Sequence, residues 1–274
     1  MSKIKIGIIG GSGLGDLNFL ENRQEKTVIT PFGTPSDVIV VGTYRSVECV
    51  FLARHGKEHS IVPSEVNYRA NVWALKEEGC THIVATTTCR SLQGYIHPGD
   101  IILIHDFLDR TTARKQSFYD GTLKDFQGIS HVSMNEPFCP LTRAILASSI
   151  KSLGYPFHER GTVITVEGPR FSTWAESRLW REWRADVTNM STVPEVVLAK
   201  EAGLLYASLA LVADYDTWRD DHEALHAEQA VKTYKEVAEK ACKVILCAIP
   251  KFVNADWEEA ITKSKDIARL SIMK

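Results

Sequence analysis

The chain has 274 residues, of which 44% are hydrophobic, and a formal net charge of −2. This composition is typical of a globular protein, and a chain of this length can bury a sizeable core. The near-neutral charge argues against nucleic acid or a membrane surface as the main partner, because both attract a basic face.

The hydrophobic pattern predicts strands that alternate with helices along the chain. Runs of β-branched and apolar residues predict strands at 4–9, 38–41, 49–52, 82–86, 101–104, 163–166 and 204–212. Helical spacing of apolar residues predicts helices at 66–78, 141–153, 194–201, 221–246 and 256–267. Such alternation predicts an α/β fold with a mixed or mostly parallel sheet that is covered on both faces.

No internal repeat or flexible linker divides the sequence, so we expect one domain over residues 1–274. The segment 107–136 is irregular and polar, which is typical of a functional or interface loop. No apolar run approaches the roughly 18 residues of a membrane span, and the first residues lack a signal-peptide pattern. The cysteines form no Cys-x-x-Cys pair, a pattern typical of free thiols. We expect a cytoplasmic protein, with the nucleus as a further compartment.

The first predicted strand leads into the glycine-rich turn Gly10-Gly11-Ser12-Gly13. Such a turn can direct several backbone N–H groups at an anion. The dinucleotide fingerprint fits poorly, because Asp16 stands where its third glycine is required, and no Walker motif is present. A phosphate site and a tight turn without a ligand both remain open at this point.

Polar side chains, and one aromatic side chain, follow four of the predicted strands where each strand ends. They are Arg54 and His55, then Thr87, Thr88 and Cys89, then Phe171 and Ser172, and finally Asp214 and Asp216. Ligands of open α/β sheets collect at the carboxyl ends of strands. An arginine and a histidine suit an anion, an aromatic ring can stack on a base, and one of two neighbouring carboxylates can hold a proton. Each group also has a purely structural explanation.

The segment His222-Glu223-Ala224-Leu225-His226 matches the zincin pattern His-Glu-x-x-His. The segment is highly charged and falls at a predicted helix start, which favours a solvated first turn. A metal site also needs supporting groups around its ligands, and the sequence shows none here. We therefore expect no metal.

Several long motifs together resemble the trimeric purine nucleoside phosphorylase superfamily, and most closely its 5′-methylthioadenosine phosphorylase branch. The resemblance covers essentially the whole chain. The motifs that carry it include Lys5-Ile6-Gly7-Ile8-Ile9-Gly10-Gly11-Ser12-Gly13-Leu14, Leu52-Ala53-Arg54-His55-Gly56, Val166-Glu167-Gly168-Pro169-Arg170-Phe171-Ser172 and Asn189-Met190-Ser191-Thr192-Val193-Pro194-Glu195.

The resemblance implies a single-domain α/β fold with a central mixed, barrel-like sheet flanked by helices, and a homotrimer. It implies phosphorolysis of methylthioadenosine, in which inorganic phosphate is a co-substrate and no metal or organic cofactor takes part. Adenosine is a further expected substrate. The alternatives are a phosphorylase of 6-oxopurine nucleosides and a non-catalytic binder of purine or phosphate.

The resemblance also implies roles for individual residues. The phosphate-binding residues would be Ser12, Arg54, His55, Thr87, Thr88 and Ser191. The nucleoside-binding residues would be Cys89, Phe171, Ser172, Asn189, Met190, Asp214, Asp216, His131, Ala227 and Val231. Within this set, Asp214 would face purine N7 and the 6-amino group with Asp216 beside it, and these two aspartates would be catalytic. His131 would reach the site of a neighbouring subunit.

Two departures from the family pattern stand near the expected base and 5′ sites. Arg90 replaces a glycine that the branch usually has, which places a bulky cation beside the base. The residues expected at the 5′ wall, Ala227, Ala230 and Val231, are smaller than is usual, which predicts a roomier pocket.

Overall fold

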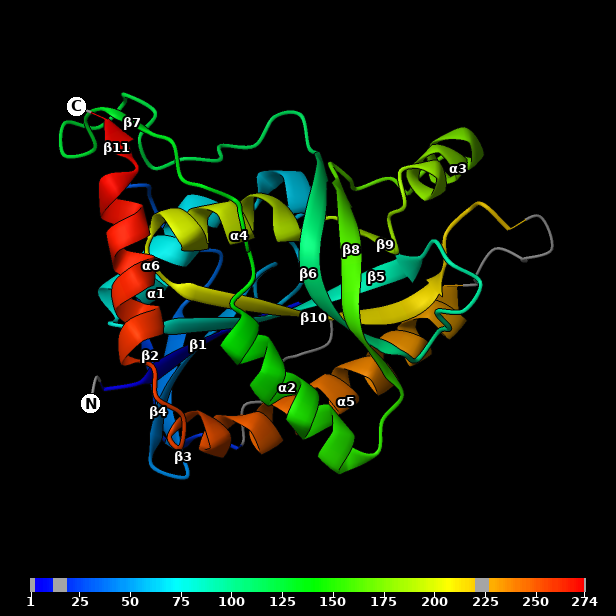
Figure 1. Cartoon of the computed structure of the whole chain (residues 1–274), viewed down its shortest axis with the longest axis horizontal. Coiled ribbons are helices and arrows are strands. Elements are labelled where there is room, and N and C mark those ends of the chain that lie inside the picture. The colour runs from blue at the N-terminus through cyan, green and yellow to red at the C-terminus, as the bar shows by residue number, and fades with distance from the viewer. Residues whose placement is uncertain (1–2, 12–18, 220–226, 274) are drawn as a thin grey trace.

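A mixed β-sheet forms the centre of the structure, with helices on both of its faces (Figure 1). The computed structural model describes residues 3–11, 19–219 and 227–273, and only the backbone of residues 227–232 and 234. Among these residues, no helix has the length and apolar character that crossing a membrane requires. The α/β class and the barrel-like sheet predicted from the sequence are both confirmed.

The strand order explains the barrel. The sheet runs through β10 (Leu205–Tyr215), β6 (Ile101–Arg110), β8 (Phe157–Val166), β9 (Val187–Asn189), β5 (His82–Ser91), β1 (Lys5–Gly10), β4 (Val47–Ala53), β3 (Ile39–Tyr44) and β2 (Glu21–Lys26). Because β10 also pairs with β5, the strands from β10 to β5 close on themselves. β4, β1, β5 and β10 are parallel neighbours, so their carboxyl ends lie at the same edge.

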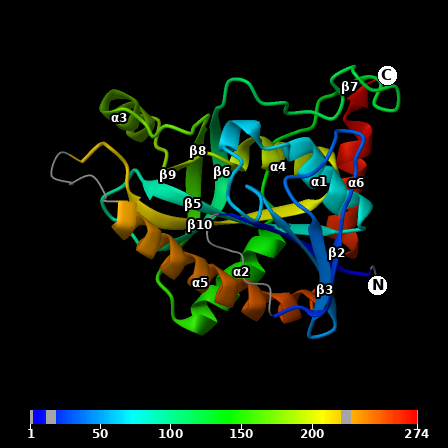
Figure 2. The ribbon, with the colours of Figure 1, turned by 180° about the vertical axis from the view of Figure 1, so that it is seen from behind.

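Two layers of helices cover the sheet (Figures 1 and 2). Helices α1 (Tyr68–Glu77) and α4 (Thr192–Glu201) lie on one face, and α2 (Pro140–Leu153) and α5 (Ala227–Phe252) lie on the other. Each layer has its own buried core: Leu75 and Val196 belong to the first, and Ile150 and Val244 to the second. The sheet is therefore apolar on both faces, and a ligand site must form at its edge.

Shorter elements complete the structure. They are the 3-10 helix η1 (Pro63–Glu65), α3 (Trp174–Glu182), α6 (Glu258–Leu270), and the pair β7 (Ile129–Ser130) and β11 (Ile272–Met273). The β7–β11 pair lies at the end of the molecule that carries the C-terminus (Figure 1). Strand β7 belongs to the segment 107–136, whose residues 107–110 continue β6 and whose other residues are irregular, as predicted.

The remaining predicted elements differ in detail from those observed. The last long helix extends to Phe252, beyond the predicted end at 246. Strand β2 was not predicted because all of its residues are polar and exposed, so only pairing with β3 defines it. Helix α3 was also missed, although its capping box of Thr173 and Glu176 is a recognisable start signal.

Candidate active site

A cavity of about 310 Å³ opens where the ends of β4, β5 and β10 meet the loops after β8 and β9. It brings together most of the predicted site residues from distant parts of the chain. Those that line it are Arg54, His55, Thr87, Thr88, Cys89, Phe171, Ser172, Asn189, Met190, Ser191 and Asp216. The arrangement follows from the parallel strands, which deliver their polar ends to one edge.

Gly11 lies at one end of the cavity, directly after β1. Its backbone N–H donates to Thr86 Oγ1 over 2.9 Å. A Cβ atom at this position would lie 2.7 Å from the Thr86 carbonyl oxygen and 3.1 Å from Arg54 Nη1. The close approach of β1, β4 and β5 therefore requires a glycine here. The neighbouring Ser12, a predicted phosphate ligand, lies outside the described residues.

Arg54 provides the positive charge of this end and is almost completely buried. Its Nε and Nη2 donate to the two carboxylate oxygens of Glu195 over 2.7 and 2.9 Å, and Nη1 donates to the Thr86 carbonyl over 2.8 Å. Tyr206 adds a hydroxyl donor to Glu195 over 2.7 Å. Burial acts to lower the pKa of Arg54, but Glu195 outweighs it and raises that pKa, so Arg54 is charged.

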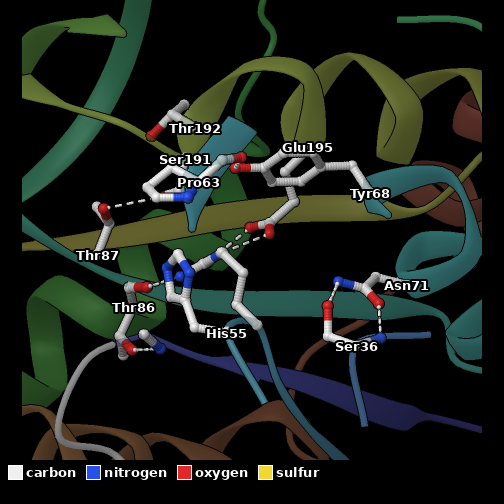
Figure 3. Close-up of polar contacts among 12 residues, drawn as sticks. Ser36, His55, Pro63, Tyr68, Asn71, Thr86, Thr87, Ser191, Thr192 and Glu195 are labelled. Atoms are coloured by element: carbon white, nitrogen blue, oxygen red, sulfur yellow. Dashed lines mark hydrogen bonds and ion pairs between the residues drawn. The ribbon is translucent and has the colours of Figure 1, made fainter. Parts of the chain in front are cut away.

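His55 follows Arg54 and faces the same end of the cavity (Figure 3). Its Nδ1 lies 2.9 Å from the Ile61 carbonyl oxygen. Because a carbonyl only accepts, Nδ1 carries the proton and Nε2 holds a lone pair in the neutral ring. Burial, helped by the charge of Arg54, lowers the pKa of His55 to about 4. His55 is therefore neutral at physiological pH.

Hydroxyl and amide groups of Thr87, Asn189 and Ser191 form a hydrogen-bond network in the cavity wall, and Figure 3 shows Thr87 and Ser191. Thr87 Oγ1 lies 2.9 Å from Ser191 Oγ and accepts from Asn189 Nδ2 over 3.1 Å. Asn189 is itself fixed by Thr165, whose hydroxyl donates to its Oδ1 over 3.0 Å. The hydroxyl of Thr88 is buried and has no hydrogen-bond partner among the described residues. A buried hydroxyl without a partner is costly, so a ligand oxygen would satisfy it.

The middle of the cavity is shaped by Met190. Its carbonyl accepts from Arg114 Nη1 over 2.7 Å and from the Tyr68 hydroxyl over 3.3 Å. Gly168 has φ +71°, and a Cβ atom there would lie 2.6 Å from Met190 Sδ. Arg114 also binds Glu167 through Nε over 2.8 Å. The loops after β8 and β9 are thus held together by an arginine from the irregular segment 107–136.

The opposite end of the cavity combines an aromatic ring with carboxylates. Phe171 offers a ring that is 54% exposed, beside Ser172 and the buried Cys89. Asp216 is fully buried, and neither of its oxygens has a hydrogen bond of normal geometry to the described residues. Burial raises the pKa of Asp216, although the nearby Ser177 and Arg90 oppose that effect. Asp216 thus has the properties of a carboxyl group that holds a proton.

Asp214 is placed differently from Asp216 and does not line the cavity. Its Oδ2 accepts from Arg90 Nη2 over 2.9 Å, and its Oδ1 accepts from the Tyr215 backbone N–H over 2.7 Å. Arg90 is itself a lining residue. The structure therefore puts Asp216, rather than Asp214, at the wall of the cavity.

Three further predicted residues do not contribute described side chains to the cavity. His131 is exposed, is not a lining residue, and donates its backbone N–H to the Ser271 carbonyl over 2.9 Å. The side chains of Ala227 and Val231 lie outside the described residues. So does the zincin-like segment, and no described group of His, Cys, Asp and Glu side chains is arranged to hold a metal.

Three residues hold groups of the cavity wall in place although the sequence alone does not predict a role for them. Glu195, Tyr206 and Arg114 were given no role, although each fixes a group at the cavity wall. Glu195 stands in helix α4 and Arg114 in the irregular segment 107–136, and only the fold shows their partners. Charged residues that are buried are almost always paired, so burial is the signal that finds them.

The family model of the phosphorylase superfamily matches residues 5–250, and this chain belongs to that superfamily. The S-methyl-5′-thioadenosine phosphorylase of Danio rerio is 54% identical to this chain, over 99% of this chain and 97% of the relative. The protein of the same name from Anopheles gambiae is 51% identical, over 100% of this chain and 98% of the relative. The predicted family resemblance is confirmed.

Solved structures agree with this membership. Methylthioadenosine phosphorylase from Schistosoma mansoni in complex with adenine superposes with a TM-score of 0.94 at 41% identity, covering 99% of both chains. A variant of adenosine/methylthioadenosine phosphorylase from the same organism, in complex with methylthioadenosine, has a TM-score of 0.93 at 40% identity, again covering 99% of both chains.

Glu195→Ala tests the buried ion pair. Removing one partner leaves the Arg54 charge buried without compensation, and such losses cost about 3–5 kcal/mol of unfolding free energy. Urea unfolding should show a decrease of that size. The matched control is Glu159→Ala, which removes an exposed partner of Lys151 and should change stability little. Equal effects of the two substitutions would contradict the importance of the pair.

Proposed function

We propose that this protein catalyses phosphorolysis of 5′-methylthioadenosine, releasing adenine and 5-methylthioribose 1-phosphate. The observation that carries the proposal is one cavity with an anion-binding end and a base-binding end. Arg54, Thr87 and Ser191 form the first end, and Phe171 and Asp216 the second. The names of the relatives support this substrate, and one of them supports adenosine as a second substrate.

The two ends fit the charges that develop in such a reaction. A phosphate oxygen forms a bond to C1′ of the sugar while the bond from C1′ to purine N9 breaks, and its electron pair goes to the base. Positive charge grows on the sugar next to the anchored phosphate, and negative charge grows on the base. The protein then acts mainly by positioning and by electrostatic stabilisation. Phosphate is the only co-substrate that this scheme needs, without a metal or an organic cofactor.

Asp216 is the acid that this scheme requires at the base. Its raised pKa lets the carboxyl group hold a proton, which it can give to N7 as the bond to the sugar breaks. Asp214 is engaged by Arg90 and is better suited to positioning that residue than to donating a proton. We therefore assign the acid role to Asp216, whereas the family resemblance gave the position facing N7 to Asp214.

His55 has a matching role at the phosphate. Since its neutral ring presents a lone pair at Nε2, His55 can accept a hydrogen bond from a protonated phosphate oxygen. Hydrogen phosphate then binds with its proton directed at His55 and its other oxygens directed at Arg54, Thr87 and Ser191. This orientation exposes an unprotonated oxygen for attack on the sugar.

We also propose that the protein is a homotrimer in the cytoplasm, as the resemblance implies. In support, His131 lies outside the cavity of its own chain, beside the β7–β11 pair. It can therefore serve a nucleoside site only in another copy. Light scattering should give three times the chain mass of 30.6 kDa, and a monomer at assay concentrations would contradict the trimer.

The reaction is tested by following base release from methylthioadenosine with and without phosphate. We expect adenine and 5-methylthioribose 1-phosphate only when phosphate is present, because phosphate is the nucleophile. Adenine release without phosphate would instead indicate a hydrolase. Binding of purine without any turnover would indicate a non-catalytic binder.

Asp216→Asn tests the proposed acid. An asparagine cannot donate the proton, and general acids contribute about 10²–10⁴-fold, so kcat/KM should fall by at least about 100-fold. In the unmodified protein, activity should decline as the pH rises through the raised pKa of Asp216, because the acid form is lost.

That alkaline decline should be absent from the residual activity of Asp216→Asn. The exposed Asp125→Asn is the control and should keep both the rate and the pH profile. An unchanged alkaline decline in Asp216→Asn would assign the proton to another group.

A further inference from the structure

Arg90 lies at the base end of the cavity and is held there from several directions. It stands near the end of β5, opposite Asp214 of β10 and Thr188 of β9 in the sheet. Its side chain lines the cavity and is only 17% exposed. The pairing of β5 with β9 and β10 therefore fixes the position of this cation at the base end of the cavity.

The guanidinium group of Arg90 lies against Asp214, Asp216 and Phe171, three of the residues expected at the base. Its Nη2 donates to Asp214 over 2.9 Å, and its Nε donates to the Tyr215 carbonyl over 3.0 Å and lies 3.8 Å from Asp216 Oδ1. Its Cζ lies 4.6 Å from the centre of the Phe171 ring. Stacking and ion pairing together hold the planar group in a defined orientation.

These contacts change what the carboxylates can offer to a base. Both oxygens of Asp214 already accept hydrogen bonds, one from Arg90 and one from the Tyr215 backbone. An unpaired carboxylate wall favours a base that donates, such as a 6-aminopurine. The ion pair of Arg90 with Asp214, and the 3.8 Å distance from Arg90 Nε to Asp216 Oδ1 at the cavity wall, weaken that preference.

Arg90 also brings donors of its own. A guanidinium has five N–H groups, and the hydrogen bonds of Arg90 to Asp214 and to the Tyr215 carbonyl use only Nη2 and Nε. A charged donor at a partly dry wall suits a carbonyl oxygen and is unsuited to an amino group. The Phe171 ring, which is 54% exposed, keeps surface on which a base can stack.

We propose that Arg90 determines base specificity and that the site accepts 6-oxopurine nucleosides in addition to 6-aminopurine nucleosides. The Arg90 guanidinium donates to the oxygen at position 6, while Asp216 serves N7 in both cases. This inference rests on the proposed phosphorolysis. The reaction is otherwise the same: phosphate oxygen bonds to C1′, the bond from C1′ to N9 breaks, and the base takes a proton from Asp216.

The sharpest test uses two substrates that differ only at position 6, methylthioadenosine and 5′-methylthioinosine. The unmodified protein should release adenine from the first and hypoxanthine from the second, both only with phosphate. In Arg90→Ala, the ratio of kcat/KM for methylthioinosine to that for methylthioadenosine should fall by about 10–100-fold, the size expected for a lost hydrogen bond from a charged donor.

Two further variants keep the test interpretable. Arg178→Ala removes an exposed arginine that stacks on Trp174 over 4.2 Å, outside the cavity, and should leave the ratio unchanged. Arg90→Gln keeps an amide donor without the charge and should give an intermediate ratio. Calorimetric binding of free adenine and hypoxanthine should show the same order of preference without depending on turnover.

The outcomes separate this inference from the proposed function. If the unmodified protein cleaves methylthioadenosine but not methylthioinosine, or if Arg90→Ala accelerates both substrates equally, Arg90 merely obstructs the site and the inference is wrong. If neither nucleoside is cleaved by the unmodified protein or by any variant, the proposed function itself fails.

Discussion

The buried pair of Arg54 and Glu195 is the constraint on which the cavity depends. Removing two charges from water costs several kcal/mol for each ion, and only good geometry with further hydrogen bonds offsets that cost. Both conditions are met here. Two N–H groups of Arg54 donate to the two carboxylate oxygens of Glu195. A third N–H group of Arg54 donates to the Thr86 carbonyl, and the Tyr206 hydroxyl donates to Glu195. The pair thereby joins β4, β5, α4 and β10 at one point, and it fixes a cation at the mouth of the closed barrel.

The base end follows a different electrostatic rule. Asp214 is compensated by Arg90, whereas Asp216 lies 3.8 Å from the same guanidinium and has no hydrogen bond of normal geometry among the described residues. One cation thus leaves one carboxylate paired and the other able to hold a proton. The two aspartates at the end of this strand can take separate roles because Arg90 lies 2.9 Å from Asp214 but 3.8 Å from Asp216.

The sequence predicts the fold class and the edge of the sheet where the site forms, because apolar strands and polar strand ends are local signals. It does not predict the partner of Arg54, since Glu195 is 141 residues away, within helix α4. Nor does it separate Asp214 from Asp216. Residues two apart on an extended strand share a face, but the pairing of β10 with β5 shifts register just before Asp214, and the two side chains meet different surroundings. Arg114 was equally hidden, since a polar irregular segment gives no sign of a buried arginine.

Burial shifts the pKa values of the two titratable groups of the site in opposite directions, and each shift favours the neutral form of its group. It lowers the pKa of His55 to about 4 and raises the pKa of Asp216. A neutral imidazole can accept a hydrogen bond, and a protonated carboxyl group can donate its proton. In the proposed reaction, the attacking hydrogen phosphate carries a proton that the sugar phosphate product loses at neutral pH. The base that leaves the sugar must gain a proton. The site therefore has a hydrogen-bond acceptor beside the nucleophile, at His55, and a proton donor beside the leaving group, at Asp216.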